Sequence, residues 1–541
     1  MHVASEGLTT TFRVLAQADS EAVGRVLESA LDCGSEIIQE EALVGILTRR
    51  DLGGQRELLR RWDSLDSRWR EIIKKHRSRM IWALRDAVLG SDLTMCASGC
   101  HAAVWLREYD LIPALLNTLS DPLSASGDLV ALTLLGLTEQ LYEELSLPPE
   151  DGTRRDPQLV RQHAVSGLEE AVQRYGRHKR REAIEAFLIL VNRDNVTLKQ
   201  ILQDPHHPAF LALVDALLKS PRPGVIRLLL NFLDDPHAPS AAVTAVGNRG
   251  DAPFVRYLLR KIGREPSPVV RQNLKRITAI AWLRNLDDNL ESLDDGGQHA
   301  LVRLVMASGI PRQQAFATIA QLMSGGSSGG RRAAAEALEE FNGGEANSLA
   351  LAALDDADPH VQAAVLGHIR RRGIPGMLSR LIDLLESPHL MVRQAARKSL
   401  AEFSFKRFIG AFDMLDEAVR RSTGALVKKI DSHTIPLLQS ELRSRVRTRR
   451  LRGLAIARSM DAVAEIEPLV VELLQDEDHL IRAEAAAALA SSRSEESLHA
   501  LEELLGDRSL VVQEAAQKSL AARKAGAAAG NVAADFPERA G

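Results

Sequence analysis

Residues 392–403 read VRQAARKSLAEF, and their apolar and small side chains recur along one face of a helix. Val392, Ala396, Leu400 and Phe403 stand at positions i, i+4, i+8 and i+11, a spacing that predicts an amphipathic helix. Related patterns return at residues 361–369, 481–489 and 512–520. Neighbouring copies start 31 residues apart, at 361 and 392 and again at 481 and 512. A fixed period of this size indicates a stack of similar supersecondary units.

Each of these helices follows a second apolar segment and a short polar turn, such as DDADPH, ESPH, QDEDH or GDRS. Prolines preceded by Asp, Ser or Glu recur with a similar period, at Pro205, Pro236, Pro266, Pro359 and Pro388. An Asp or Ser side chain caps the first amides of a helix, and proline fits the first helical position. The unit is therefore helix, capped turn, helix. Because no alternating strand pattern competes, we expect an all-α superhelix of roughly 31-residue units.

Composition narrows the class of protein further. The chain has 541 residues, of which 45% are hydrophobic and 4% aromatic, so Leu, Ala and Val supply the core. Three cysteines do not make a disulfide framework and fit a reducing compartment. The first residues lack the pattern of a signal peptide, and nowhere do 18 apolar residues run together. We therefore expect a cytoplasmic protein without a membrane span.

The segments DPHVQAAVLGHI (358–369) and VRQAARKSL (392–400) resemble HEAT repeats. They look closest to the short bacterial type known from phycobilisome lyases, with its Asp turn, Val-Arg pair and Ala-Ala. The resemblance covers residues 200–520 well and residues 19–145 more loosely. It implies a bacterial α-solenoid, but the fold hosts many unrelated roles. If the protein is an enzyme, the resemblance implies a bilin-lyase-like activity. No local motif supports that activity.

The array predicts four regions. Residues 1–146 form an N-terminal helical region with divergent units, and residues 147–157 (LPPEDGTRRDP) a linker rich in proline and charge. Residues 158–522 form the repeat solenoid, and residues 523–541 a disordered tail. The glycine-rich residues 324–330 (SGGSSGG) are interpreted as a flexible turn between helices, because they lack the Lys-Ser/Thr ending of a P-loop.

No catalytic, metal or cofactor set emerges. Cys96 and Cys100 share a helix face beside His101, but a structural zinc site needs four ligands, so packing is the better interpretation. The histidines of successive turns stand one repeat apart, too far to share a metal ion. None of the 15 histidines precedes glutamate, which removes the His-Glu pairs of HEAT-type deoxyhypusine hydroxylases. We expect no enzyme and no cofactor.

Charge distribution carries the one functional hypothesis. Residues 420–452 hold ten Lys or Arg and two acids in a chain whose net charge is −4. Such density predicts an anion-binding patch. Its candidate partner-binding residues are Lys428, Lys429, Arg443, Arg445, Arg447, Arg449, Arg450 and Arg452.

The repeat pattern complicates this patch. Aligning Val446-Arg447 with Val392-Arg393 puts Arg449 and Arg450 on positions that should be buried. Isolated buried charge is too costly, so the helix is rotated, loosely packed or neutralised by an acidic partner. A solvated basic face remains the alternative to a functional patch.

Two further basic stretches, residues 68–79 with Trp69 and residues 174–181, leave nucleic-acid binding open. Together these observations predict a protein-interaction scaffold with a basic patch for an acidic partner. Nucleic-acid binding through the phosphate backbone is the first alternative, and a bilin-lyase-like protein is the second.

Overall fold

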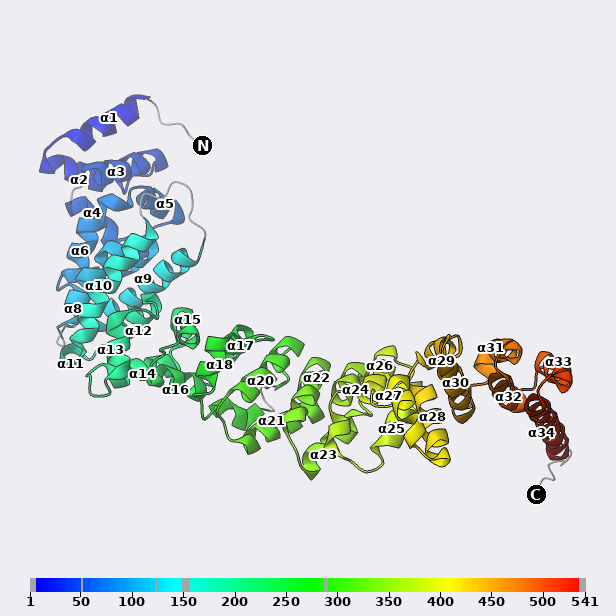
Figure 1. Cartoon of the computed structure of the whole chain (residues 1–541). Helices are drawn as coiled ribbons and strands as arrows, with labels where there is room; N and C mark the ends of the chain where they lie inside the picture. Colours follow the sequence, from blue (N-terminus) through cyan, green and yellow to red (C-terminus); the bar gives the residue numbers. More distant parts are fainter. Residues whose placement is uncertain (1–5, 50–51, 122–123, 148–155, 287–289, 535–541) are drawn as a thin grey trace, which may run out of the picture. The chain divides into compact units, whose positions relative to one another are not determined.

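Every regular element in the described residues is a helix. The computed structural model describes residues 6–49, 52–121, 124–147, 156–286 and 290–534, with residues 525–534 described by their backbone alone. The chain divides into two compact units, residues 1–330 and 331–541, which are described separately. The fold class is all-α, as the periodicity predicts, and in each unit the helices stack one after another as in a solenoid (Figure 1).

The first unit holds helices that stack on near neighbours along the chain, for example α9 on α12 and α15 on α17. Their bounds are α1 Glu6–Gln17, α2 Glu21–Ala30, α3 Glu36–Arg49, α4 Leu52–Arg60, α5 Ser67–Lys75, α6 Ile81–Leu89, α7 Leu93–Leu106, α8 Ile112–Leu119, α9 Gly127–Ser146, α10 Pro157–Gln173, α11 Tyr175–His178, α12 Arg181–Leu190, α13 Val196–Gln203, α14 Phe210–Lys219, α15 Pro223–Asn231, α16 Ser240–Asn248, α17 Ala252–Ile262, α18 Pro268–Leu274, α20 Asp295–Ala307 and α21 Arg312–Gly325. Helix α22, Ser328–Ala337, contains the boundary between the units.

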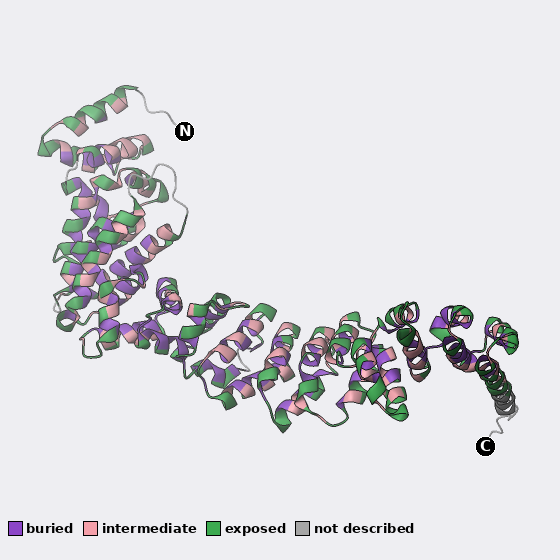
Figure 2. Cartoon of the chain, in the orientation of Figure 1, coloured by how far each residue is buried: buried purple, intermediate pink, exposed green. Residues whose placement is uncertain are grey.

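The second unit repeats the predicted pair more regularly. Its helices are α23 Gly344–Ala353, α24 Pro359–Leu366, α25 Met377–Asp383, α26 Leu390–Ser399, α27 Phe405–Ala411, α28 Glu417–Ile430, α29 Thr434–Leu442, α30 Arg447–Ser459, α31 Glu467–Glu472, α32 His479–Ala488, α33 Glu495–Glu503 and α34 Leu510–Ala534. The second helices of successive pairs pack on one another, α24 on α26 and α30 on α32 on α34. Their inward faces form the core, and solvent covers the outward faces (Figure 2).

Burial confirms the predicted helix faces. Val392, Ala396 and Leu400 are completely buried, as are Ile481, Val512 and Ala516. Leu520 is only partly buried. The phenylalanines at 405, 408 and 412 are buried, and the rings of Phe408 and Phe412 meet edge to face with centroids 5.6 Å apart. Small residues at the shared faces let neighbouring helices approach closely.

The capping chemistry holds at some turns and differs at others. The Asp358 carboxylate accepts the amide of His360, and Pro359 is the first residue of α24, as predicted. Pro205 and Pro236 instead lie in turns ahead of α14 and α16. There the preceding aspartates, 204 and 235, accept the amide two residues on and stabilise a turn rather than a helix start.

The glycine-rich residues 324–330 form less of a loop than predicted. Only Gly326 and Ser327 stand between α21 and α22. Gly329 and Gly330 lie in the first turn of α22, where a Cβ atom would meet Asp295 and Gln298 at 2.8 and 2.1 Å. The glycines are therefore required by close packing of α22 on α20.

The predicted domain boundaries remain predictions. Residues 148–155 of the proposed linker 147–157 lie outside the described residues. The solenoid 158–522 includes the boundary between the two compact units. Helix α34 continues to Ala534, past the start of the tail predicted at 523, and residues 535–541 lie outside the described residues.

Candidate functional site

The predicted basic residues gather on three consecutive helices of the second unit. Lys428 and Lys429 lie in the last turn of α28, and Arg443 is the C-cap of α29. Arg445 lies in the turn to α30, and Arg447, Arg449, Arg450 and Arg452 lie in the first two turns of α30. The local sequence therefore places all eight cations around the α29–α30 pair.

Six of these eight cations form ion pairs within the chain. Lys428 lies 2.6 Å from Glu465, Lys429 3.8 Å from Glu386, and Arg452 3.8 Å from Asp413. Arg447 pairs with Asp478, Arg449 with Glu441 and Arg450 with Asp476. Much of the positive charge in residues 420–452 is therefore balanced by acids of the same unit.

Arg450 shows why these charges stand where they do. Its Nη1 atom donates to the carbonyl oxygen of Ser444, six residues earlier, at 2.9 Å. In other repeats, a side chain of the second helix likewise donates to the backbone carbonyl oxygen six residues earlier, in the preceding turn. These bonds are 2.6 to 2.8 Å long and join Gln362 to Asp356, Arg393 to Ser387, Arg482 to Asp476 and Gln513 to Asp507. Arg450 is therefore the counterpart of Arg393.

This bond corrects the repeat alignment by three residues. Gly453 and Ala457, not Arg450, occupy the positions of Ala396 and Leu400, and both are buried. Arg449 falls on the position of Val392, yet it remains 46% exposed and extends to Glu441 on α29, with 2.9 Å between Nε and Oε2. The Arg449 guanidinium holds the pKa of Glu441 below its usual value. The acids that neutralise this helix are intramolecular.

The same arginines also link one repeat to the next. Arg482 on α32 donates two bonds of 2.9 Å to the Asp507 carboxylate in the following turn. Arg331 does the same with Asp356, at 2.8 and 3.0 Å. The hydrogen bond from Arg482 lowers the pKa of Asp507 and outweighs the effect of burial. Arg450 and Asp476 form the equivalent link, so Arg450 is part of the framework of the fold.

Two of the predicted residues remain available to a partner. Within the part of the chain that the structure describes, Arg443 and Arg445 are exposed and have no ion pair. The next residue, Val446, is 52% exposed. We call Arg443, Arg445 and Val446 the turn patch.

Several cations of the other two basic stretches form contacts within the first unit. Arg68 lies 2.7 Å from Glu36 and 2.5 Å from Glu40. Arg70 and Lys74 lie over the rings of Trp62 and Trp105, at 5.6 and 5.5 Å from the ring centroids. In the third stretch, the arginines at 174, 180 and 181 pair with acids at 170, 128 and 215. The predicted stacking of bases near Trp69 gains no support from this arrangement.

The cysteines Cys96 and Cys100 are buried free thiols on α7. A hydrogen bond between them lowers the pKa of Cys96 to about 7 and raises that of Cys100. Among the described residues, no group of three or more His, Cys, Asp or Glu side chains is placed to hold a metal ion.

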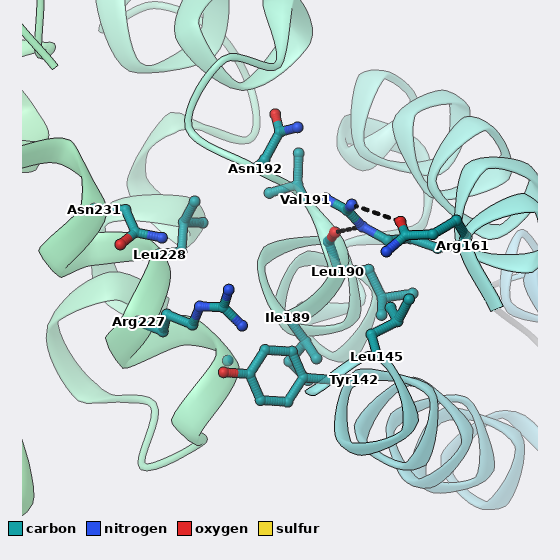
Figure 3. Close-up of a pocket in the computed structure, with 12 residues that line it drawn as sticks. Tyr142, Leu145, Arg161, Ile189, Leu190, Val191, Asn192, Arg227, Leu228 and Asn231 are labelled. Atoms are coloured by element: carbon teal, nitrogen blue, oxygen red, sulfur yellow. Dashed lines mark hydrogen bonds between the residues drawn. The ribbon is translucent and has the colours of Figure 1, made fainter. Parts of the chain in front are cut away.

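Sequence reasoning missed a pocket in the first unit, lined by α9, α10, α12 and α15 (Figure 3). Arg161 enters it from α10 and Arg227 from α15, and Tyr142 of α9 lies beside the Arg227 guanidinium. These residues are far apart in the sequence and none stands in a motif. Only the packing of four helices brings them together.

Comparison with known proteins identifies part of the chain. Residues 316–401 and 432–521 match a family model described as HEAT repeats. These two segments are similar to HEAT repeats. They contain the links from Arg331, Arg450 and Arg482. No curated protein matches the chain.

Solved structures match most of the chain at low identity. An engineered protein is 17% identical, with 93% of this chain and 98% of that one covered and a TM-score of 0.17. Kap95p, studied with RanGDP, is 12% identical, with 97% and 77% covered and a TM-score of 0.26. Kap121p bound to Pho4p is 14% identical, with 95% and 57% covered and a TM-score of 0.25. In the part of the chain described, no helix is long and apolar enough to cross a membrane.

Proposed function

We propose that this HEAT-repeat chain is a non-enzymatic scaffold that binds other proteins, with the turn patch as a contact for an acidic partner. The observation that carries this proposal is the contrast within residues 420–452. Arg443 and Arg445 are exposed without an ion pair among the described residues, whereas the six other predicted cations are paired. Arginine is enriched in protein interfaces and among the residues that contribute most to binding.

Two further features support the proposal. The three cysteines are free thiols, which fits the reducing conditions of the cytoplasm, the location that we propose. Arg68 and three arginines of residues 174–181 form ion pairs within the chain, which favours protein over nucleic acid as the partner.

The structure shows which arginines a mutational test of the turn patch should change. Reversing Arg449 or Arg450 would break ion pairs that hold α30 on its neighbours, and a loss of binding would then have two causes. The informative variant is Arg443→Glu with Arg445→Glu. Its matched control is Arg397→Glu with Lys398→Glu, which changes the charge equally at two exposed positions of α26.

The experiment is affinity capture from nuclease-treated native lysate, followed by quantitative mass spectrometry. We expect a set of proteins retained by the wild type and by the control variant and reduced about tenfold or more by the turn-patch variant. Circular dichroism establishes that both variants keep their helicity. Equal capture by both variants would refute the role of the turn patch.

A salt titration separates the alternatives. Nucleic-acid binding through phosphates weakens linearly in log salt with a steep slope, whereas an interface with apolar contacts weakens less. Capture that disappears on nuclease treatment would favour the nucleic-acid alternative. A purified chain that carries visible absorbance from a bound chromophore would favour the bilin-lyase-like one.

A further inference from the structure

The first unit contains a concave site built from two adjoining hollows. The smaller has a volume of about 130 Å³ and is lined by α9, α10, α12 and α15. The larger has a volume of about 410 Å³ and is lined by α9, α15 and α17. Tyr142, Arg227 and Asn231 line both hollows, so the two adjoin each other.

The smaller hollow is positively charged. Arg161 and Arg227 enter it from opposite sides (Figure 3), and no carboxylate is among its described lining residues. Arg161 is anchored by its Nε atom, which donates to the carbonyl oxygen of Leu190 at 2.7 Å. Burial, and then the charge of Arg227, lower the pKa of Arg161. Two cations that repel each other in a partly buried site are stabilised by an anion between them.

This arrangement differs from the basic stretches. Within the described residues, Arg161, Arg227 and Arg260 have no ion pair, whereas the arginines of residues 174–181 include three that do. Arg227 lies over the ring of Tyr142 and Arg260 over the ring of Tyr257, each 5.7 Å from the centroid. Stacking on an aromatic ring holds a guanidinium in place and leaves its N–H groups free for an oxyanion.

The larger hollow adds an apolar surface. Pro223, Ile226 and Leu230 of α15 line it together with the two tyrosines, and Arg260 and Lys261 complete the lining. Lys261 pairs with Asp234, which leaves Arg227 and Arg260 as the cations of this hollow without an ion pair among the described residues. The site thus joins a small cationic hollow to an apolar one.

We propose that this site binds an extended acidic peptide segment of a partner protein. A carboxylate or phosphate of the peptide lies between Arg161 and Arg227, and a neighbouring apolar or aromatic side chain enters the larger hollow. Asparagine and glutamine side chains on the rim, from Gln158, Asn192 and Asn231, bind the peptide backbone. Nucleic acid fits less well, because a strand of phosphates needs a continuous row of cations. The site lies in a different unit from the turn patch, so the two proposals stand independently.

The test is fluorescence anisotropy with the full chain and labelled peptides. The probe peptide contains Leu-Asp-Glu-Phe between Gly-Ser flanks, and its neutral counterpart contains Leu-Asn-Gln-Phe. A third peptide replaces the acids by phosphoserine, which separates carboxylate from phosphate as the preferred anion. We expect the better anionic peptide to bind at least about tenfold more tightly than the neutral one, as charge-assisted hydrogen bonds require.

Three substitutions locate the binding. Arg227→Gln is the main variant, because Arg227 is exposed and the substitution removes its stacking on Tyr142 but no hydrogen bond or ion pair of the described residues. Arg256→Gln on α17 is the matched control, an exposed arginine outside both hollows. Tyr257→Ala tests the apolar hollow. We expect Arg227→Gln to weaken the anionic peptide about tenfold, Tyr257→Ala to weaken both charged and neutral peptides, and Arg256→Gln to change neither.

Three outcomes would overturn the proposal. The first is equal binding of the anionic and neutral peptides. The second is an unchanged affinity in Arg227→Gln while the circular dichroism spectrum is intact. The third is tighter binding of an oligothymidylate of about 20 nucleotides than of any peptide, with loss in Arg227→Gln, which would make the site one for nucleic acid.

Discussion

Replacing Arg482 by alanine tests the link between successive repeats most directly. Its side chain is 5% exposed and donates two bonds of 2.9 Å to Asp507, which is 13% exposed. It also donates to the carbonyl oxygens of residues 476 and 477, at 2.8 and 3.2 Å. The substitution therefore removes the Arg482 donors from a partly buried carboxylate and from two turn carbonyls.

The magnitude follows from these contacts. Removing one partner of a buried ion pair costs about 3–5 kcal/mol. Asp507 keeps its bond from the Ser509 amide, at 2.8 Å, and some exposure to water, so the lower end of that range applies. We expect Arg482→Ala to destabilise the packing of α32 and α34 by about 3 kcal/mol. Arg482→Lys keeps the charge but loses the two-pronged geometry, and we expect an intermediate cost of about 1–2 kcal/mol.

Hydrogen–deuterium exchange read by mass spectrometry is the appropriate assay. A repeat chain of this length does not unfold in a single step, so local protection is more informative than one global midpoint. A loss of about 3 kcal/mol corresponds to exchange of the α32 and α34 amides about 100-fold faster, because each 1.4 kcal/mol is a factor of ten. Amides of α24 and α26 should be little affected, since each repeat contacts only its neighbours.

Arg508→Ala is the control, because Arg508 is exposed and its one bond, to Glu477, is 3.5 Å long. We expect that variant to lie within about 0.5 kcal/mol of the wild type. The reasoning is refuted if Arg482→Ala exchanges no faster than Arg508→Ala. It is also refuted if Arg482→Ala and Asp507→Ala have additive effects, since interacting partners must show coupling.

Three further predictions concern stability. The pKa of Asp507 lies below its ordinary value of 3.8, so the stability that its charge contributes is complete above pH 3.8 and is lost as the pH falls through the lowered pKa. Thermal melts from about pH 6 to pH 3 should therefore show a smaller loss of stability in acid for Asp507→Asn than for the wild type. Equal losses in the two proteins would contradict this prediction. Gly247→Ala puts a Cβ atom 2.3 Å from a backbone carbonyl oxygen and should lower the free energy of unfolding by about 1–3 kcal/mol in denaturant titration. The Cβ atom of Gly410→Ala meets no atom within 4 Å, so this variant should be neutral or more stable by up to about 1 kcal/mol. A greater loss of stability in Gly410→Ala than in Gly247→Ala would show that the close approach at Gly247 is absent. Leu400→Ala removes a completely buried side chain and should cost about 2–5 kcal/mol of local stability, measured by hydrogen exchange. Leu520→Ala should cost less, because Leu520 is only partly buried. Equal costs for the two variants would argue against this burial pattern.

The repeat pattern predicts the fold from sequence because it depends on local periodicity. Val392, Ala396 and Leu400 recur at helical spacing, and the structure buries all three. The aspartate turns were predicted for the same local reason, since a cap needs only residues two or three positions apart. The role of each proline was less predictable. A proline can start a helix, as Pro359 does, or stand in a turn, as Pro205 does, and both conformations have the same φ.

The register of α30 shows the limit of pattern reading. Val446-Arg447 resembles Val392-Arg393, but the hydrogen bond to the turn carbonyl identifies Arg450 as the counterpart of Arg393. The sequence cannot distinguish these arginines, because all four residues of the first helical turn, 447–450, are basic or polar. The structure distinguishes them by which guanidinium reaches Ser444 and the Asp476 carboxylate.

By itself, the sequence determined the all-α repeat architecture, the pairing of helices around short capped turns and the excess of positive charge in residues 420–452. These are properties of residues close together along the chain. Only the tertiary structure decided which of those charges are balanced by acids of the same unit, as Arg450 is by Asp476, and which, in Arg443 and Arg445, are exposed. It also decided that Tyr142, Arg161 and Arg227 share one pocket, because α9, α10 and α15 meet only when the solenoid stacks. The surface of this pocket is created by the stacking and has no period in the sequence.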